Sequence, residues 1–448
     1  MKRTLVALVV AVAALSTQFA TATNGFETTS CKYPAGHPLP GAGAVRHVGT
    51  GTGDFATIQD AVNAAVEGDT ILIAPGEYKE EVLVKRPGLR IRGESRTGVV
   101  LNGESTRNVG IEVEADRVVV ENLTVHNYKG HGVHWLFVTG YWGRYITAYD
   151  MGDYGIFAFG SRCGEFSDSY GSGNADSAIY IGQCYPCDAR IHDVDAEENG
   201  LGYSGTNAGG NLVIHDSIWR NNALGVVPSS LDSEARPPSR GLTIENNIID
   251  SNNLANAPGA GLTALFWGVG VALAGTSDGS VTGNTITNNA MAGIVINPLP
   301  DTNVYLPYAN TIWGNTVSHD ADLWPDSYDL AQGAGSGPDN CWSDNTTGVA
   351  GQDLVVAPPL LQTVWGCDVI AGTQQTPPGG DPRVEASLIE GFAGLNGRTI
   401  SPWQTWPALT CADHAIACAD QPDDNGAGGY ADDGAVDGWL PDLASRLA

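Results

Sequence analysis

The chain has 448 residues, 58 of them Gly, with 22 Lys and Arg against 50 Asp and Glu and a formal net charge of −28. So acidic a surface repels phosphate backbones, which excludes nucleic acid as the expected partner. The abundance of turn-forming residues leaves few stretches that can form a long helix. A repeated architecture is therefore an alternative to several separate domains.

The first 22 residues have the pattern of a secretory signal peptide. Lys2 and Arg3 precede a short apolar run, and Ala20 and Ala22 form an A-x-A cleavage site. The run is too short to span a bilayer and no second membrane span is predicted, so we expect a secreted protein. Loss of Lys2 and Arg3 leaves 20 basic against 50 acidic residues, a charge of −30. We expect residues 23–44 to form an N-terminal segment ahead of the folded domain.

Eight cysteines accompany this export signal, and an even number in an exported chain predicts disulfides. We expect Cys163 to pair with Cys184 or Cys187. These last two also form a CxxC pattern, but export and the lack of a second CxxC disfavour a redox or zinc site. The expected local bridges are Cys341–Cys367 and Cys411–Cys418.

The first regular elements follow a short lead. Apolar residues recur at helical spacing and predict one amphipathic helix over 55–66. Short apolar segments over 70–73, 82–84 and 89–91 predict strands. A helix in this position would cap the apolar end of a solenoid.

From residue 122 onward, a polar residue followed by a short apolar segment recurs at spacings of 23, 23, 25 and 23. Later spacings of 31, 37 and 31 indicate inserted loops. Asn and Asp, which occupy seven of the eight positions, tolerate the left-handed backbone of a tight turn. The eight positions are Asn122, Tyr145, Asp168, Asp193, Asp216, Asn247, Asn284 and Asn315.

A second lane of short strands has the same period. Because side chains alternate along a strand, one set points inward and the next set outward. We predict an all-β fold, a right-handed parallel β-helix over 45–350, in which residues one period apart are vertical neighbours about 4.8 Å apart. The inward set is Val133, Ile156, Ile179, Tyr203 and Val226, and the outward set is His134, Phe157, Tyr180, Ser204 and Val227.

The repeat fades near residue 350. A segment rich in Pro and Gly at 373–382 favours a linker over 351–382. Residues 383–448 are expected to form an irregular, disulfide-containing tail, which either covers the end of the solenoid or stays partly loose.

The segments Asp54–Ala65 and Gly68–Tyr78 resemble the opening of the pectin-lyase-like superfamily, in which pectin methylesterases and many bacterial β-helix repeat proteins begin in this way. The resemblance covers residues 45–350 and implies a right-handed parallel β-helix. It is less specific for activity, because this superfamily includes lyases, hydrolases, esterases, epimerases and non-enzymes.

None of the superfamily's catalytic motifs is intact in this chain. The segment Tyr154–Gly160 is nearest to the GxVDFIFG-like strand of methylesterases but lacks the Asp that attacks the ester, so methylesterase activity is disfavoured. Gly130–Gly132 matches only the GHG element of polygalacturonases. Arg236–Arg240 is one residue too short for the RxPxxR motif of pectate lyases. The DPH-type motif of mannuronan epimerases does not occur.

Two carboxylates stand out by position. Asp153 and Asp176 are 23 residues apart and each precedes its strand by two residues, which predicts successive coils and a separation of about 5 Å. Such a pair can divide the roles of acid and base or nucleophile, and the separation suits a retaining glycosidase that requires no cofactor. The same pair can instead bind Ca²⁺ or form a solvated turn ladder without a function.

The outward residues His134, Phe157 and Tyr180 predict a flat strip against which a sugar ring can stack. Gln183 and Asp150 are the expected polar contacts. The strip can also form merely because aromatic side chains pack well together on sheets.

Two further features bear on this strip. Inserted loops at 228–240 or 253–269 can lie over it. His131 and His134 are three residues apart, but on a strand and turn they point in different directions, which disfavours a metal site made from these two alone.

We therefore predict a secreted, monomeric protein that binds a polysaccharide or cell-envelope glycan and acts on it as a lyase, hydrolase or epimerase through Asp153 and Asp176. The alternative is a non-catalytic surface or matrix protein that uses the same scaffold for adhesion. Convergent carboxylates beside an open aromatic strip would favour the enzyme, whereas a loop-covered face would favour the binder.

Overall fold

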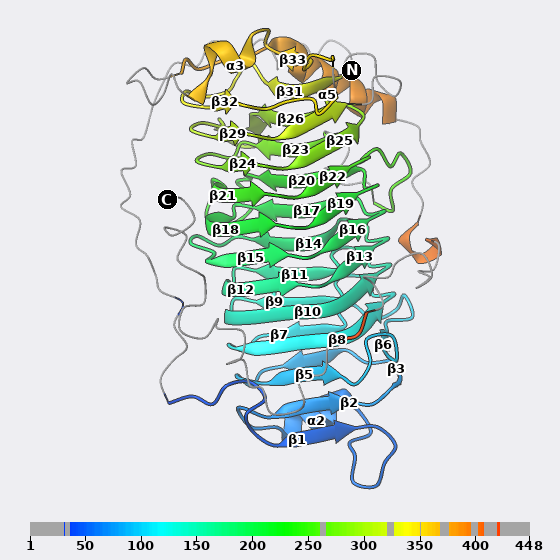
Figure 1. The fold of residues 1–448 in the computed structure, drawn as a ribbon. Helices are drawn as coiled ribbons and strands as arrows, with labels where there is room; N and C mark the ends of the chain where they lie inside the picture. Colours follow the sequence, from blue (N-terminus) through cyan, green and yellow to red (C-terminus); the bar gives the residue numbers. More distant parts are fainter. Residues whose placement is uncertain are drawn as a thin grey trace.

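The computed structural model describes residues 31, 36–259, 266–319, 327–349, 351–367, 376–395, 402–406 and 419–421. They form a right-handed parallel β-helix, a stack of coils that runs the length of the molecule (Figure 1). Among these residues, no helix is long and apolar enough to cross a membrane. The predicted signal peptide and the predicted Cys411–Cys418 bridge lie outside the described residues.

Each complete coil contributes strands to three faces. Within the described ranges, faces 1 and 2 belong to one 20-stranded sheet, which bends where β8 and β10 pass from face 1 to face 2. Face 1 contains β1 (Val45–Val48), β2 (Thr70–Ile73), β5 (Arg90–Gly93), the first halves of β8 (Val118–His126) and β10 (Thr139–Tyr149), β12 (Arg162–Ser167), β15 (Ala189–His192), β18 (Gly209–His215), β21 (Arg240–Glu245), β24 (Ser280–Thr282), β29 (Thr311–Trp313) and β32 (Cys341–Ser343).

Face 2 contains the second halves of β8 and β10, and in addition β3 (Gly76–Tyr78), β6 (Val99–Asn102), β13 (Tyr170–Ser172), β16 (Asp195–Glu197), β19 (Ile218–Arg220), β22 (Ile248–Asp250), β25 (Thr285–Asn289) and β30 (Thr316–His319). Face 3 is a separate 11-stranded sheet of the described residues. It contains β4 (Val82–Val84), β7 (Ile111–Val113), β9 (Val133–Leu136), β11 (Ile156–Phe159), β14 (Ser177–Gly182), β17 (Leu201–Thr206), β20 (Leu224–Ser229), β23 (Val269–Ala274), β26 (Ala292–Asn297), β31 (Tyr328–Gln332) and β33 (Val356–Ala357).

The predicted inward lane of face 3 is confirmed. Its five residues are consecutive register partners, and each is fully buried in the core of the solenoid. The lane continues through Val271, Ile294 and Leu330. Burying one such apolar side chain stabilises the fold by about 1.5–3 kcal/mol, so the repeated lane is a major source of its stability.

The eight recurring polar positions were predicted to stack at one corner, which is the corner between faces 1 and 2. Beyond Asp216 this predicted register is wrong by one residue. Ile218 pairs with Ile248, which places Asp216 opposite Asn246 rather than Asn247. Asn246 shares the left-handed backbone of Asp216, with φ of 56° and 48°. The insertion between these coils has no fixed length, so spacing alone could not reveal the shift.

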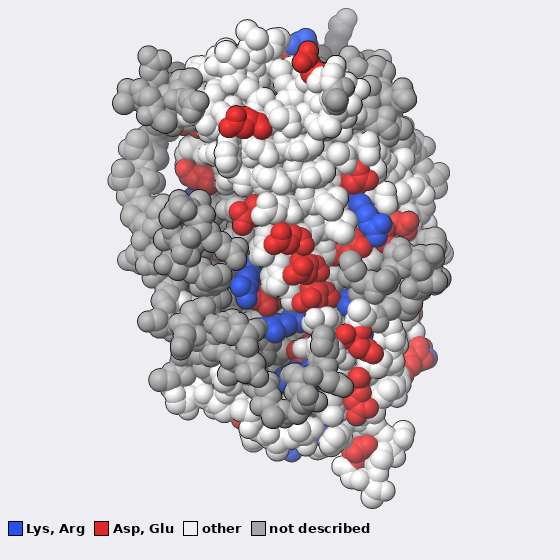
Figure 2. All heavy atoms as spheres, viewed as in Figure 1, with Lys and Arg blue, Asp and Glu red and all other residues white. Residues whose placement is uncertain are grey.

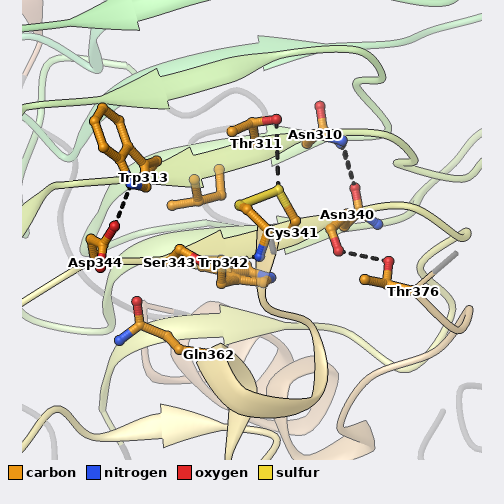
Figure 3. The surroundings of a disulfide bond; sticks show 12 residues. Asn310, Thr311, Trp313, Asn340, Cys341, Trp342, Ser343, Asp344, Gln362 and Thr376 are labelled. Carbon is orange, nitrogen blue, oxygen red and sulfur yellow. Dashed lines mark hydrogen bonds between the residues drawn. A yellow bond between two sulfur atoms is a disulfide. The ribbon is translucent and has the colours of Figure 1, made fainter. Parts of the chain in front are cut away.

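Asn247 instead begins a ladder of buried side-chain amides. Each Nδ2 donates to Oδ1 of the Asn on the next coil and to backbone carbonyls, which satisfies polar groups that the corner buries. This ladder is Asn247, Asn284, Asn315 and Asn345, and a second at the corner between faces 2 and 3 is Asn174, Asn199, Asn222, Asn252 and Asn289. A further bonded pair, Asn310 and Asn340, is visible in Figure 3.

Acidic side chains gather in a band that runs along the side of the solenoid shown in Figure 2. At the corner between faces 1 and 2, the carboxylates of Asp193 and Asp216 stay largely exposed and accept hydrogen bonds from the neighbouring His192 and His215. These are turn residues with a structural role, in agreement with the sequence analysis.

The N-terminal cap is α2 (Ile58–Ala64), shorter than the predicted helix over 55–66. Thr57 accepts a hydrogen bond from the backbone of Asp60 and fixes the start, while Phe55 is still extended and donates to His47. The helix lies at the first coils (Figure 1). The predicted strands 70–73 and 82–84 match β2 and β4, and the strand predicted at 89–91 is β5, one residue later.

The predicted linker is wrong in part, because it contains regular elements that close the C-terminal end. β33 pairs with β31, and α3 (Leu361–Val364) follows it. The predicted Cys341–Cys367 bridge is confirmed and ties this segment to β32 (Figure 3). In the tail, α5 (Pro382–Leu395) buries Val384 and Leu388 against face 3, so the described part of the tail acts as a cover. The short helix η3 (Trp403–Thr405) is also described.

The predicted pairing of Cys163 is wrong. It bonds to Cys31, 132 residues earlier, while Cys184 bonds to Cys187. The backbone N–H of Cys163 does donate to the carbonyl of Cys187 on the next coil. The sulfur of Cys187, however, is bonded to Cys184 in the same turn.

Candidate functional site

Asp153 and Asp176 occupy the same corner between faces 2 and 3 on successive coils. The backbone N–H of Asp176 donates to the carbonyl oxygen of Asp153 at 3.1 Å. The Asp153 side chain is 41% exposed, so solvent reaches it. The Asp176 carboxylate accepts a hydrogen bond at 3.4 Å from Ser204 Oγ on the following coil. The repeat thus brings the two carboxylates to one place.

The surroundings raise the pKa of both groups. Burial raises the pKa of Asp153 to about 6. Burial, followed by repulsion from Asp153, raises the pKa of Asp176 to about 7, although hydrogen bonds from Ser204 and Tyr154 act in the opposite direction. Because the two groups interact, their titration steps belong to the pair. Near neutral pH the pair can therefore hold a single proton.

A third carboxyl group, which the sequence analysis missed, joins the site from an insertion at 230–239. Glu234 Oε2 accepts hydrogen bonds from Tyr180 Oη at 3.2 Å and from Gln183 Nε2 at 2.8 Å. Burial raises the pKa of Glu234, and its charge in turn helps to raise that of Asp176. The available signal was the break in period two coils after Tyr180, where an insertion with acidic residues begins.

The insertion that carries Glu234 is held on both sides. Asn207 lies at the corner between faces 3 and 1. Its Oδ1 accepts a hydrogen bond from Leu231 N at 3.0 Å, and its Nδ2 donates one to the carbonyl oxygen of Leu231 at 2.8 Å. Ala235 N donates to Gln183 Oε1 at 3.1 Å. On the far side, Asp232 accepts hydrogen bonds from Asn303 and Tyr305. These last two belong to the hairpin of β27 (Leu299–Pro300) and β28 (Val304–Tyr305).

The predicted aromatic strip forms, but it is covered, in line with the alternative that the loop at 228–240 lies over it. His134, Phe157 and Tyr180 are vertical neighbours with ring centroids 4.3 and 4.7 Å apart, as the period predicted. They are, however, only 7%, 6% and 2% exposed. The insertion reaches Tyr180 through Glu234, and Tyr154 stacks on Phe157 at 4.6 Å. No sugar can stack directly on these three rings.

Two neutral imidazoles border the carboxylates. His131 Nδ1 lies 3.6 Å from Asp153 Oδ2, and its ring meets that of His134 edge-on at 5.0 Å. Burial lowers the pKa of His131 to about 4 and that of His134 to about 3, so neither is charged at neutral pH. Within the described residues, neither ring nitrogen of His134 has a hydrogen-bond partner.

Metal-ligating atoms are not closely clustered at this corner. Among the described residues, the one group of three such atoms within 4.8 Å of one another is Cys31, Cys163 and Asp188, and its two sulfurs form a disulfide. The carboxylates of Asp153, Asp176 and Glu234 do not meet that criterion.

Asp150 lies on the face 2 side of the turn that leads to Asp153. It follows β10 with a left-handed φ of 56° and packs beside Gly173 and Trp406. Burial raises the pKa of its carboxyl to about 8. Gln183, the other predicted polar contact, lies at the corner between faces 3 and 1 and is bonded to Glu234. The two predicted polar contacts therefore lie at different corners of the solenoid.

Comparisons with known proteins bear on the fold. A family model described as the right handed beta helix region matches residues 143–306. Similar solved structures include the A-module of the Azotobacter vinelandii mannuronan C-5 epimerase AlgE4, with 17% identity over 64% of this chain and 89% of that chain and a TM-score of 0.47. An alginate lyase from Paenibacillus sp. str. FPU-7 has 16% identity over 65% and 98% and a TM-score of 0.47.

Pectate lyase Pel9A has 13% identity over 69% of this chain and 82% of that chain, with a TM-score of 0.38. No curated protein matches the sequence. Similarities at this level concern the fold alone. The chain is a right-handed parallel β-helix protein, which is the fold that the sequence resemblance implied.

Proposed function

We propose that the protein binds an extracellular polysaccharide at the corner between faces 2 and 3, where β11 and β14 begin, and cleaves its glycosidic bonds with Asp153 and Asp176. The observation that supports this most strongly is the pair of carboxyl groups on adjacent coils, whose pKa values of about 6 and about 7 keep the pair partly protonated near neutral pH. Perturbed carboxyl pairs of this kind are typical of acid–base catalysis.

The chemistry balances with these two residues and one water. Protonated Asp176 gives its proton to the glycosidic oxygen as the bond to the anomeric carbon breaks, and ionised Asp153 forms a bond to that carbon. Asp176, now ionised, then takes a proton from the water that displaces Asp153. The spacing of adjacent coils, about 5 Å, suits this route with retention of configuration. The route uses no cofactor.

Charge favours a neutral substrate. A chain with a net charge of −28 repels polyuronates unless a cation bridges the contact. The rings beside the carboxylates, His131, Tyr154 and Phe157, are uncharged at neutral pH, so they add no attraction for an anionic sugar.

Export supports an extracellular substrate. The first 22 residues have the pattern of a signal peptide, and the described residues contain three disulfides, which persist in oxidising compartments. We therefore place the activity outside the cytoplasm.

Incubation with a panel of neutral and uronic-acid glycans, with and without Ca²⁺, tests the proposal. New reducing ends without unsaturated products are expected, with a loss of about 10²–10⁴-fold in Asp153→Asn and Asp176→Asn. Asp216→Asn is the matched control, because this corner Asp is 56% exposed and lies between faces 1 and 2. Unsaturated products would reassign the reaction to a lyase, and silence across the panel would remove the enzymatic proposal.

The buried strip favours a second candidate, a non-catalytic glycan-binding protein. Since His134, Phe157 and Tyr180 are covered, this face lacks an open aromatic platform directly beside the carboxylates. This candidate predicts that the protein is retained on a glycan array while the panel shows no product, and that Asp153→Asn leaves the retention unchanged.

A further inference from the structure

One large aromatic side chain near the proposed site remains in solvent. Phe137 follows β9 at the corner between faces 3 and 1 and is 70% exposed. Its φ of 54° is left-handed, a conformation that suits Gly or Asn better than a bulky residue. The next residues at this corner, Gly160, Gln183 and Asn207, have the same backbone conformation. The fold therefore gains little from Phe at this position.

The ring of Phe137 is nevertheless held in place. It lies against Gly160 on the next coil, where an added Cβ would approach the ring to 2.4 Å, so a side chain at that position would displace it. Phe159 meets the ring edge-on, with centroids 5.3 Å apart. The ring thus has a protein-facing side fixed by these two residues and a side open to solvent.

Phe137 also ends a row of aromatic contacts across face 3. Tyr154 stacks on Phe157 at 4.6 Å, Phe157 contacts Phe159 at 5.8 Å, and Phe159 contacts Phe137. The row begins beside Asp153 and follows β11 to the opposite corner. Measured from ring to ring along these contacts, the row is about 16 Å long, more than a disaccharide can span.

We propose that Phe137 is a stacking platform for a distal sugar unit of the polysaccharide, which crosses face 3 along β9 and β11 from the Asp153 corner. The inference rests on the proposed function, because it takes the same ligand. The apolar C–H face of a pyranose ring matches an exposed, immobilised aromatic ring, and burying that ring removes apolar surface from water. Gln183, at the same corner two coils on, marks where the insertion with Glu234 closes this path.

Binding of oligosaccharides of two lengths tests the platform. A disaccharide and a hexasaccharide of the glycan identified by the panel are titrated into the Asp176→Asn protein, which prevents turnover, with and without Phe137→Asn. Asn accepts the left-handed backbone, so the variant is expected to fold, which thermal unfolding checks. The hexasaccharide should bind about tenfold more weakly and the disaccharide equally well. Trp313→Ala is the control, because Trp313 is an aromatic residue on face 1 that is 51% exposed.

The outcomes separate this inference from the proposed function. Unchanged hexasaccharide affinity in Phe137→Asn, or an equal loss for both lengths, overturns the platform and leaves the carboxylate proposal standing. Failure of the unsubstituted protein to bind any glycan overturns both. Sedimentation that shows dimers dissociating in Phe137→Asn, with glycan affinity unchanged, would assign the ring to a contact between copies and so also overturn the platform.

Discussion

The two halves of face 3 share one interior and differ on the outside. In the upstream half (β9, β11 and β14) the outward side chains are His134, Phe157 and Tyr180, with carboxylates at the corner. In the downstream half (β23, β26 and β31) they are Ala272, Val295 and Ala331. These join a second apolar cluster in which Trp267, Leu299 and α5 cover the sheet. The inward lane, which is apolar in both halves, thus determines the fold. The residue types of the outward lane differ between the halves according to the segment that covers them.

This difference bears on function. The chain covers the outward strip in both halves, but downstream the covered surface is wholly apolar, as in any protein interior. Upstream, Asp153 stays accessible to solvent, and Asp176, Glu234 and His131 titrate away from their ordinary ranges. A face that served only for packing would resemble the downstream half. We therefore place the proposed ligand on the upstream half.

Truncation of the inward lane should have the largest effect and should not distinguish the halves. We expect Ile179→Ala upstream and Ile294→Ala downstream each to lower the free energy of unfolding by about 2–5 kcal/mol, because both side chains are fully buried. Urea denaturation measures both. A loss below about 1 kcal/mol in only one half would contradict the shared interior.

Polar changes on the outward lane should distinguish the halves. Val295→Thr places a hydroxyl in the downstream apolar cluster and should cost about 1–3 kcal/mol if the hydroxyl finds no partner. Ser204→Ala upstream removes a hydroxyl that bonds Asp176 and should cost about 1 kcal/mol or less. Equal costs in the two denaturation curves would mean that the halves are covered alike.

The dependence of stability on pH should also differ. The pKa of Asp176 rises from 3.8 to about 7 in the folded protein, so its stabilising contribution is complete below about 4 and is lost as pH rises through 7. Asp176→Asn should therefore raise the melting temperature by a few degrees at pH 8 and change it little at pH 4. An equal shift at both pH values would show that Asp176 titrates normally.

The smallest expected effect concerns Glu234, whose charge helps to raise the pKa of Asp176. Glu234→Gln should lower the pKa of the general acid by less than about one unit, so the alkaline limb of the pH–activity profile moves to lower pH. Glu245→Gln on face 1 is the control. An unchanged profile would mean that the charge of Glu234 does not act on the pair, and a move to higher pH would contradict the expected sign.

Sequence periodicity predicted what repeats and missed what is inserted. The inward lane and the juxtaposition of Asp153 with Asp176 follow from a spacing of 23 residues, so both could be predicted. The period break showed that a loop at 228–240 can cover the aromatic strip, but no period determines the path of that loop, so the position of Glu234 could not be predicted. The Cys31–Cys163 bridge spans 132 residues, so local spacing could not indicate it. The one-residue error in register at Asn247 arises from the same insertion at 230–239, which lies between Asp216 and Asn247.

A crystal structure of the Asp176→Asn protein with a bound hexasaccharide tests the central claim most directly. The account predicts one anomeric carbon beside the Asp153 carboxylate and the sugar chain lying across β9 and β11 toward Phe137. A glycan bound along face 1 or face 2, without contact to Asp153, would contradict it.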